Sequence, residues 1–188
     1  MNTITLYERN AKINILEQRK VFMEVRQMAT AFLINDDKVL MMKKARSKLF
    51  NFEFWGGIGG HLEYEELNFP MKASYREIEE ETGFKKSEIK NFKLKYILIE
   101  NNCGEIRQQY VYFGETKHMN FISSDEGELY WIHKNELLNL HMSKIIKFTI
   151  EHYLENPNLD DILVGTITAN NESNPQIQWA TTKETVTF

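Results

Sequence analysis

Three glutamates stand close together in one short segment of this chain. Glu77, Glu80 and Glu81 are spaced i, i+3 and i+4, which places their side chains on one face if the segment is helical. Like charges at this spacing repel each other, and the negative end of the helix dipole adds to the cost. A hard cation such as Mg²⁺ offsets that cost, because it takes carboxylate oxygens and keeps positions open for water and phosphates. Arg76 stands four residues before Glu80, where it can orient that carboxylate.

A glutamate-rich helix face can also be simply solvated, so the elements around the trio matter. The segment is predicted to be a helix from Pro70 to Thr82, because Pro70 suits the first turn and Gly83 suits the C-terminal stop. Asn68 or a nearby polar residue is expected to cap its first turn. A helical wheel of this segment predicts a separate stripe of residues that faces the core: Met71, Tyr75, Ile78 and Thr82.

The remaining pattern predicts a sheet. Residues 27–42 should form two strands around the turn residues Asn35-Asp36-Asp37, and further strands are expected at 92–99, 107–115 and 127–132. A short helix is expected at 135–140, a longer helix at 143–154, and a hairpin within 162–187. The segment 55–61 holds four glycines and is predicted to be a loop with close backbone approach rather than a packed element. The fold class is therefore α/β (α+β), a mixed β-sheet sandwiched between helices with an added C-terminal hairpin.

Length and composition fit one domain. The 188 residues are expected to form a single domain with a core at about 27–156 and two terminal extensions. The net charge of −4 argues against a nucleic acid partner, and no apolar stretch is long enough to span a membrane. The only cysteine, Cys103, cannot form an intrachain disulfide, which favours a cytoplasmic location.

The segment 59–84 resembles the Nudix box of the MutT/Nudix hydrolases. That box is Gly, five residues, Glu, seven residues, Arg-Glu, an aliphatic residue, any residue, Glu-Glu, any residue, Gly, and an aliphatic or aromatic residue. Gly60 and Glu66 match its first part. Its second half is matched throughout, by Arg76, Glu77, Ile78, Glu80, Glu81, Gly83 and Phe84. Nine residues, 67–75, stand where the family has seven, which leaves the role of Glu66 open.

The resemblance implies a fold and an activity. The fold would be a mixed sheet between helices, and the activity would be Mg²⁺-dependent hydrolysis, with Mn²⁺ as the alternative ion, of a nucleoside diphosphate linked to another moiety. By this likeness the metal would be held by Glu77, Glu80, Glu81 and the carbonyl of Gly60, and Arg76 would pin a carboxylate. The general base would be either a glutamate of the box or a residue of a downstream loop, where the candidates are Asp125, Glu126 and Glu128. Glu128 is favoured, because relatives often carry a glutamate three residues before a tryptophan.

Substrate recognition is less constrained by the sequence. Arg46 could meet phosphates, Trp55 could stack on a base, and Tyr110 lies on a strand that could face the cleft. The expected partner is a small nucleotide diphosphate, and a homodimer is left open. One hypothesis is a house-cleaning pyrophosphohydrolase for oxidised dGTP-like triphosphates. The alternatives are an ADP-ribose or nucleotide-sugar pyrophosphatase, and a non-catalytic Nudix module that binds a nucleotide or a partner.

Overall fold

The computed structural model describes residues 24–44, 53–102, 104–122 and 124–183. Within these ranges nine strands form one sheet, accompanied by two α-helices and three short 3-10 helices. The strands are β1 (Glu24–Asn35), β2 (Lys38–Lys44), β3 (Phe54–Gly56), β4 (Ile58–His61), β5 (Ile89–Asn102), β6 (Glu105–Thr116), β7 (Glu128–His133), β8 (Leu163–Ala169) and β9 (Pro175–Thr181). The helices are α2 (Pro70–Thr82) and α3 (Lys144–Glu155), with η1 (Tyr64–Glu66), η2 (Lys86–Glu88) and η3 (Leu137–Asn139).

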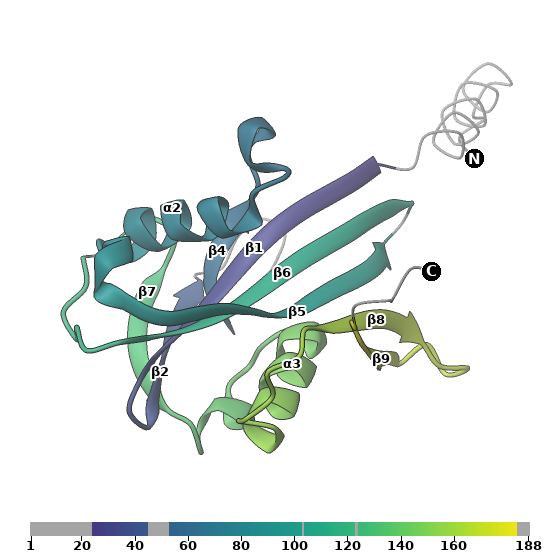
Figure 1. The fold of residues 1–188 in the computed structure, drawn as a ribbon. Coiled ribbons are helices and arrows are strands. Elements are labelled where there is room, and N and C mark those ends of the chain that lie inside the picture. Colours follow the sequence, from purple (N-terminus) through teal and green to yellow (C-terminus); the bar gives the residue numbers. More distant parts are fainter. Residues whose placement is uncertain (1–23, 45–52, 103, 123, 184–188) are drawn as a thin grey trace, which may run out of the picture.

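The sheet is mixed, as predicted. Its strand order is β3-β2-β1-β6-β5-β8-β9, with β4 paired to β1 and β7 paired to β2. The β1–β6 and β5–β8 pairs are parallel, and the other pairs are antiparallel. Helix α2 lies over one face of the sheet, and α3 lies on the opposite side with the β8–β9 hairpin (Figure 1). The predicted arrangement of a mixed sheet between helices is confirmed.

Strand β1 is central and buried on both faces. Phe32 belongs to the apolar cluster that includes Ile150 of α3, whereas its neighbour Leu33 belongs to the cluster that includes Ile78 of α2. Successive side chains of a strand point to opposite faces, so a strand covered on both sides needs an uninterrupted apolar run. The run from Ala29 to Ile34 supplies it, interrupted only by Thr30.

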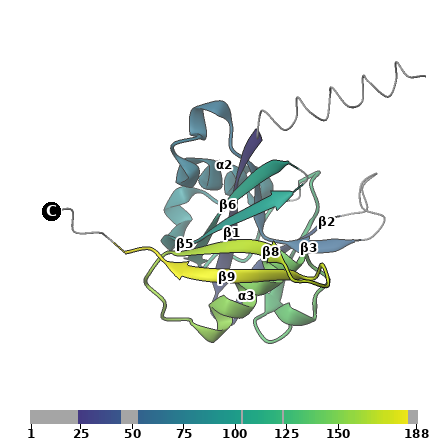
Figure 2. The same ribbon diagram turned by 90° about the vertical axis from the view of Figure 1, so that its right-hand side faces the viewer.

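Both predicted hairpins are present. β1 and β2 pair antiparallel up to Asn35 and Lys38, and Asp36 takes a positive φ of 53° in the turn, which Asp tolerates better than most residues. β8 and β9 pair antiparallel and extend the sheet beyond β5. Figure 2 shows this added hairpin from the front, with β8 and β9 side by side. No helix in the described part of the chain is both long and apolar enough to cross a bilayer.

Two local predictions were wrong, and a third was correct only in part. The N-cap of α2 is Phe69, not Asn68, and no side chain caps the helix; the amide of Lys72 bonds instead to the backbone carbonyl of Phe69 at 2.8 Å. Met71, predicted to face the core, is 41% exposed, because it lies in the first turn. The expected helix at 135–140 is only the short η3.

The glycine-rich segment 55–61 also differs from its prediction. Most of it forms β3 and β4, and β4 pairs with β1 from Ile58 to His61. The predicted close approach is nevertheless present. Gly59 has φ 147°, and a Cβ atom there would lie 2.0 Å from the carbonyl oxygen of Ala29. The glycines are therefore needed inside a strand, where β4 runs very close to β1.

Candidate active site

Helix α2 places two of its glutamates against the glycines of β4. The amide of Gly59 donates a hydrogen bond of 3.0 Å to Oε2 of Glu81. A Cβ atom on Gly60 would lie 2.7 Å from Oε1 of Glu77, so only glycine leaves room for that carboxylate. Glu77 is 7% exposed and Glu81 is 2% exposed. Two carboxylates one helical turn apart are thus buried between the helix and the sheet.

Arg76 fixes the carboxylates around it. Its Nε and Nη2 atoms donate to the two oxygens of Glu66 at 3.0 and 2.9 Å. Its Nη1 atom donates to Glu77 at 2.9 Å and to Glu80 at 3.0 Å, and Nη2 also donates to the carbonyl of His61 at 3.2 Å. The planar fork of arginine suits such a two-oxygen contact. The predicted contact between Arg76 and Glu80 is therefore present.

The structure also places Glu66, whose role the sequence left open. Glu66 is 2% exposed, and its carboxylate accepts from Arg76 and from the amide of Glu63. The hydrogen bond from Arg76 holds the pKa of Glu66 below its ordinary value in spite of burial. The contact between Glu66 and Arg76 is thus formed with the extra residues before α2 in place. The five-residue spacing from Gly60 was the signal that marked it.

Burial makes the two inner carboxylates hard to ionise. Burial raises the pKa of Glu81 to about 8, and repulsion from Glu126 and Glu77 adds to it, while Lys44 acts in the opposite direction. Burial also raises the pKa of Glu77, although the hydrogen bond from Arg76 opposes the change. Oε1 of Glu81 is buried and has no hydrogen-bond partner. A buried oxygen without a partner is costly unless a cation or a proton satisfies it.

These residues fit a divalent cation, although they do not form a closed cage. Among the described residues, no three acidic, histidine or cysteine side chains are grouped so that they could hold a metal ion. Glu77 and Glu81 are together, whereas the side chain of Glu80 is 58% exposed and turned to Arg76. The unpartnered oxygen of Glu81 and the space that Gly60 leaves for Glu77 suit an ion that keeps water and substrate oxygens in its shell. Ligation by Glu80 and by the carbonyl of Gly60 stays a prediction.

The turn before β7 brings a further carboxylate to this place. Glu126 repels both Glu77 and Glu81, and its Oε2 lies 3.2 Å from Nζ of Lys44. Glu128, which the sequence favoured as the base, lies at the start of β7 and accepts a hydrogen bond from the hydroxyl of Tyr130. Glu126 was one of three neighbouring candidates, and no spacing could separate them, because the turn decides which one faces the helix.

The predicted substrate residues have different surroundings. Tyr110 lies in one row with Ala29 and Gly60 across three paired strands, and its hydroxyl bonds to Gln27 and Gln108. Trp55 packs edge-on against Tyr130, with ring centroids 5.4 Å apart, and borders the core cluster beneath α3. Arg46 lies outside the described residues. Contact of these residues with a substrate stays a prediction.

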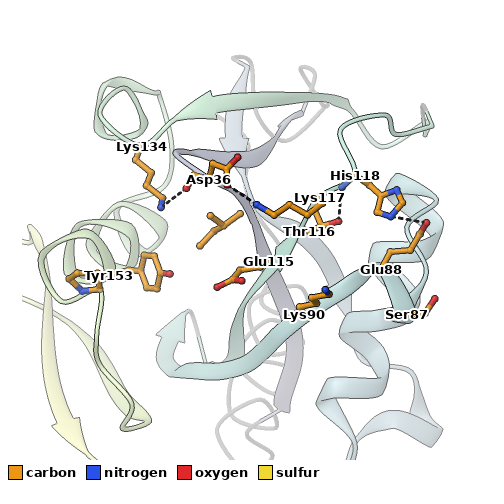
Figure 3. Close-up of a pocket in the computed structure, with 12 residues that line it drawn as sticks. Asp36, Ser87, Glu88, Lys90, Glu115, Thr116, Lys117, His118, Lys134 and Tyr153 are labelled. Atoms are coloured by element: carbon orange, nitrogen blue, oxygen red, sulfur yellow. Dashed lines mark hydrogen bonds and ion pairs between the residues drawn. The ribbon is translucent and has the colours of Figure 1, made fainter.

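A cavity of about 610 Å³ lies elsewhere, at the β1–β2 turn and the end of β6 (Figure 3). Lys117 and Lys134 both donate to Asp36 at its rim, to the carboxylate and to the backbone carbonyl respectively. Tyr153 of α3 forms part of its wall. None of its lining residues comes from β4 or α2. Its volume is in the range of small-molecule pockets, but its residues are separate from the acidic pair.

Comparison with known proteins agrees with this geometry. Residues 25–152 match the NUDIX domain family. Among solved structures, the mutator MutT protein from Bacillus halodurans is 24% identical, with a TM-score of 0.65 over 82% of this chain and 97% of that chain. A NUDIX hydrolase from Nitrosomonas europaea is 16% identical, with a TM-score of 0.63 over 78% and 80%. The MutT protein from Methanosarcina mazei Go1 is also 16% identical, with a TM-score of 0.60 over 72% and 97%.

At these identities the solved structures demonstrate a shared fold. Comparison with curated protein sequences gives no match. The family match spans more than half of the chain and includes the helix that holds the glutamates. Nudix hydrolases act on nucleoside diphosphate derivatives and generally use divalent metals. The chain therefore belongs to the Nudix family and is a hydrolase that acts on pyrophosphate bonds.

Proposed function

We propose that this enzyme hydrolyses a nucleoside diphosphate linked to another moiety with Mg²⁺ as its ion, and that Mn²⁺ can replace it. The observation that carries this proposal is the buried pair Glu77 and Glu81 over the glycines of β4. Such a pair suits a hard cation with open positions, and the substrate's phosphates can fill those positions. We also infer a cytoplasmic location from the single cysteine.

Each residue around the pair has a task in this proposal. A bound divalent ion would neutralise diphosphate charge and lower the pKa of a bound water. Glu77 and Glu81 would hold that ion, with Glu80 and the Gly60 carbonyl as further ligands. Arg76 keeps Glu77 and Glu80 in place through hydrogen bonds of 2.9 and 3.0 Å. Glu126 or Glu128 would accept the proton of the attacking water.

We take oxidised dGTP-like nucleoside triphosphates as the first substrate class, because several of the structurally similar proteins carry the name MutT. ADP-ribose and nucleotide sugars form the other class. In both classes an oxygen nucleophile attacks one phosphorus of a phosphoanhydride, and the rate depends on positioning and on charge stabilisation. The two classes differ in their products, so the products identify the substrate.

The test is a substrate panel with the purified full chain. Each compound is incubated with Mg²⁺, with Mn²⁺ or with EDTA, and phosphate, pyrophosphate and nucleoside monophosphate are quantified separately. A triphosphate pyrophosphohydrolase releases pyrophosphate and a monophosphate, whereas an ADP-ribose hydrolase releases AMP and a sugar phosphate. We expect turnover only with metal. Turnover that persists in EDTA, or a panel with no turnover, would contradict the proposal. Light scattering of the same sample tests the homodimer.

A further inference from the structure

Lys44 lies at the end of β2, beside the acidic site, and has one ion pair there. Its Nζ atom is 3.2 Å from Oε2 of Glu126. The pairing of β2 with β7 joins Lys43 to Glu128, which brings the end of β2 next to the turn that carries Glu126. The turn is held close, because a Cβ atom on Gly127 would lie 2.7 Å from the carbonyl oxygen of Lys43. The ammonium group of Lys44 is thus positioned by two neighbouring strands.

Two cationic side chains act on the acidic site, and they are bound very differently. Arg76 makes five hydrogen bonds through three nitrogen atoms, two of them to the buried Glu66. Within the described ranges the ammonium group of Lys44 pairs with Glu126 only, and the Lys44 side chain is 26% exposed. Lysine is a flexible point charge, whereas arginine in a two-oxygen contact is held in one geometry. Arg76 is therefore fixed in the site, whereas the ammonium group of Lys44 can be exchanged for another cation.

The negative charges of the neighbouring carboxylates explain why a cation is needed at this place. Glu126 lies close to Glu77 and Glu81, which are both buried. Among the charges that act on Glu81, Lys44 has the largest favourable influence. Coulomb interactions are stronger near the protein interior than in water, so one positive charge matters here. The ion pair between Lys44 and Glu126 therefore places a positive charge next to these carboxylates.

We propose that Lys44 is the counter-cation of the metal-free site, and that it releases Glu126 when a divalent ion binds the carboxylates. This inference rests on the proposed function. Lys44 and the ion compete for the same negative charge, so Lys44 weakens metal binding. Once released, its ammonium group is free to pair with a phosphate oxygen of the substrate, and substrate binding then follows metal binding.

The chain offers a matched control in the preceding residue. Lys43 lies on the same strand and pairs with Glu53 at 2.8 Å, with a side chain 30% exposed. Adjacent residues of a strand point to opposite faces. Removing the charge of Lys43 therefore changes the net charge by the same amount without removing the ion pair at Glu126.

The test measures Mg²⁺ affinity by calorimetry at one fixed pH and at constant ionic strength. We expect Lys44→Met to bind Mg²⁺ roughly fivefold more tightly than the wild type. Lys44→Arg keeps the charge and should bind Mg²⁺ less tightly than Lys44→Met. Lys43→Met should bind Mg²⁺ like the wild type. Circular dichroism confirms that each variant is folded.

A second measurement uses the wild-type protein and needs no variant. Acetylation by acetic anhydride, read by mass spectrometry, reports how free each lysine amine is. We expect Mg²⁺ to increase the acetylation of Lys44 and to leave that of Lys43 unchanged. Two results would overturn this inference alone, while the enzyme still hydrolyses its substrate. One is a folded Lys44→Met variant that binds Mg²⁺ as tightly as the wild type or less tightly. The other is acetylation of Lys44 that Mg²⁺ does not change. A wild-type protein that binds no Mg²⁺ overturns the proposed function as well.

Discussion

Arg76 illustrates how much one side chain organises in this enzyme. It joins Glu66 from the segment before the helix to Glu77 and Glu80 on the helix itself. Glu66 is buried, so its charge needs this partner, since removing one member of a buried ion pair leaves the other uncompensated. Arg76 does not touch Glu81, whose unpartnered oxygen remains available. At the scale of residues, the site therefore contains two kinds of carboxylate: Glu66 is held by Arg76, whereas Glu81 has an oxygen that can bind an ion.

The raised pKa of Glu81 predicts a pH-dependent stability in the absence of metal. Its pKa is about 8 in the folded protein against 4.5 for the ordinary group, so between these values the unfolded chain ionises first. Stability should therefore fall as pH rises from 4.5 to 8, whereas both states are protonated below that window. Since one pKa unit is worth about 1.4 kcal/mol, Glu81→Gln should be stabler than the wild type by more than about 1 kcal/mol at pH 9.

Urea unfolding in EDTA at several pH values measures this difference. The two proteins should converge near pH 4, where the Glu81 carboxyl is neutral in both states. Glu79→Gln is the matched control, because Glu79 is exposed on the same helix. A difference between Glu81→Gln and the wild type that does not change with pH would contradict the assignment to Glu81.

The identity of the proton acceptor gives a second prediction at this scale. Glu126 acts electrostatically on Glu77 and Glu81, whereas Glu128 bonds to Tyr130. We therefore expect Glu126→Gln to lower kcat by at least about 100-fold, the usual contribution of a general base, and Glu128→Gln to lower it much less. Steady-state kinetics of both variants with the substrate found in the panel decide between them. The reverse order would restore the preference that the sequence suggested for Glu128.

The contact between α2 and β4 is the element that makes the site. The helix can approach the strand because the strand has glycines where the carboxylates lie. At the other end of α2, Gly83 adopts φ 78° and its amide bonds to the carbonyl of Glu79, which ends the helix directly after Glu81 and Thr82. The position and the length of the helix thus both depend on glycine.

Gly60→Ala tests this element. The new Cβ atom would lie 2.7 Å from Oε1 of Glu77, so we expect the carboxylate to be displaced, the affinity for Mg²⁺ to fall by at least about tenfold, and the protein to remain folded. Calorimetry measures the affinity. The matched control is Gly56→Ala on β3, where a Cβ atom meets no atom within 4 Å. Equal affinities in both variants would mean that close contact with Gly60 does not position Glu77.

In the whole molecule, the acidic site and the β8–β9 hairpin lie on different parts of one sheet. β4 pairs with β1 and α2 lies over this part of the sheet, whereas β8 and β9 continue the sheet beyond β5 (Figures 1 and 2). Trp179 of β9 packs on Tyr96 and on His152 of α3, with ring centroids 5.2 and 4.9 Å apart. The hairpin is therefore attached to the core beneath α3 and far along the sheet from Glu77 and Glu81.

This separation predicts that the hairpin contributes stability more than catalysis. Trp179→Ala should lower the free energy of unfolding by about 2 kcal/mol, because it removes a half-buried ring and its aromatic contacts. The exposed neighbour Gln178 provides the control variant Gln178→Ala, for which we expect a change below about 0.5 kcal/mol. Chemical unfolding and kcat are measured on both variants. A large loss of kcat in folded Trp179→Ala would contradict the separation.

The sequence by itself determined the local features of this protein. The bounds of α2 followed from Pro70 and Gly83, and the turn at Asp36 and the C-terminal hairpin were also predicted correctly. The side-by-side placement of Glu77 and Glu81 followed as well. Each of these features is set within a few residues, by backbone geometry and by the spacing of side chains on a helix or a strand.

Only the tertiary structure decided which of those residues act together. It turned Glu80 to the surface, buried Glu66 beneath Arg76, made a strand of the glycine segment, and brought Glu126 next to the acidic pair. These outcomes depend on how closely α2 packs on β4 and on how the turn before β7 is held by β2. Such contacts join positions far apart in the chain, and the local pattern of a sequence does not encode their distances.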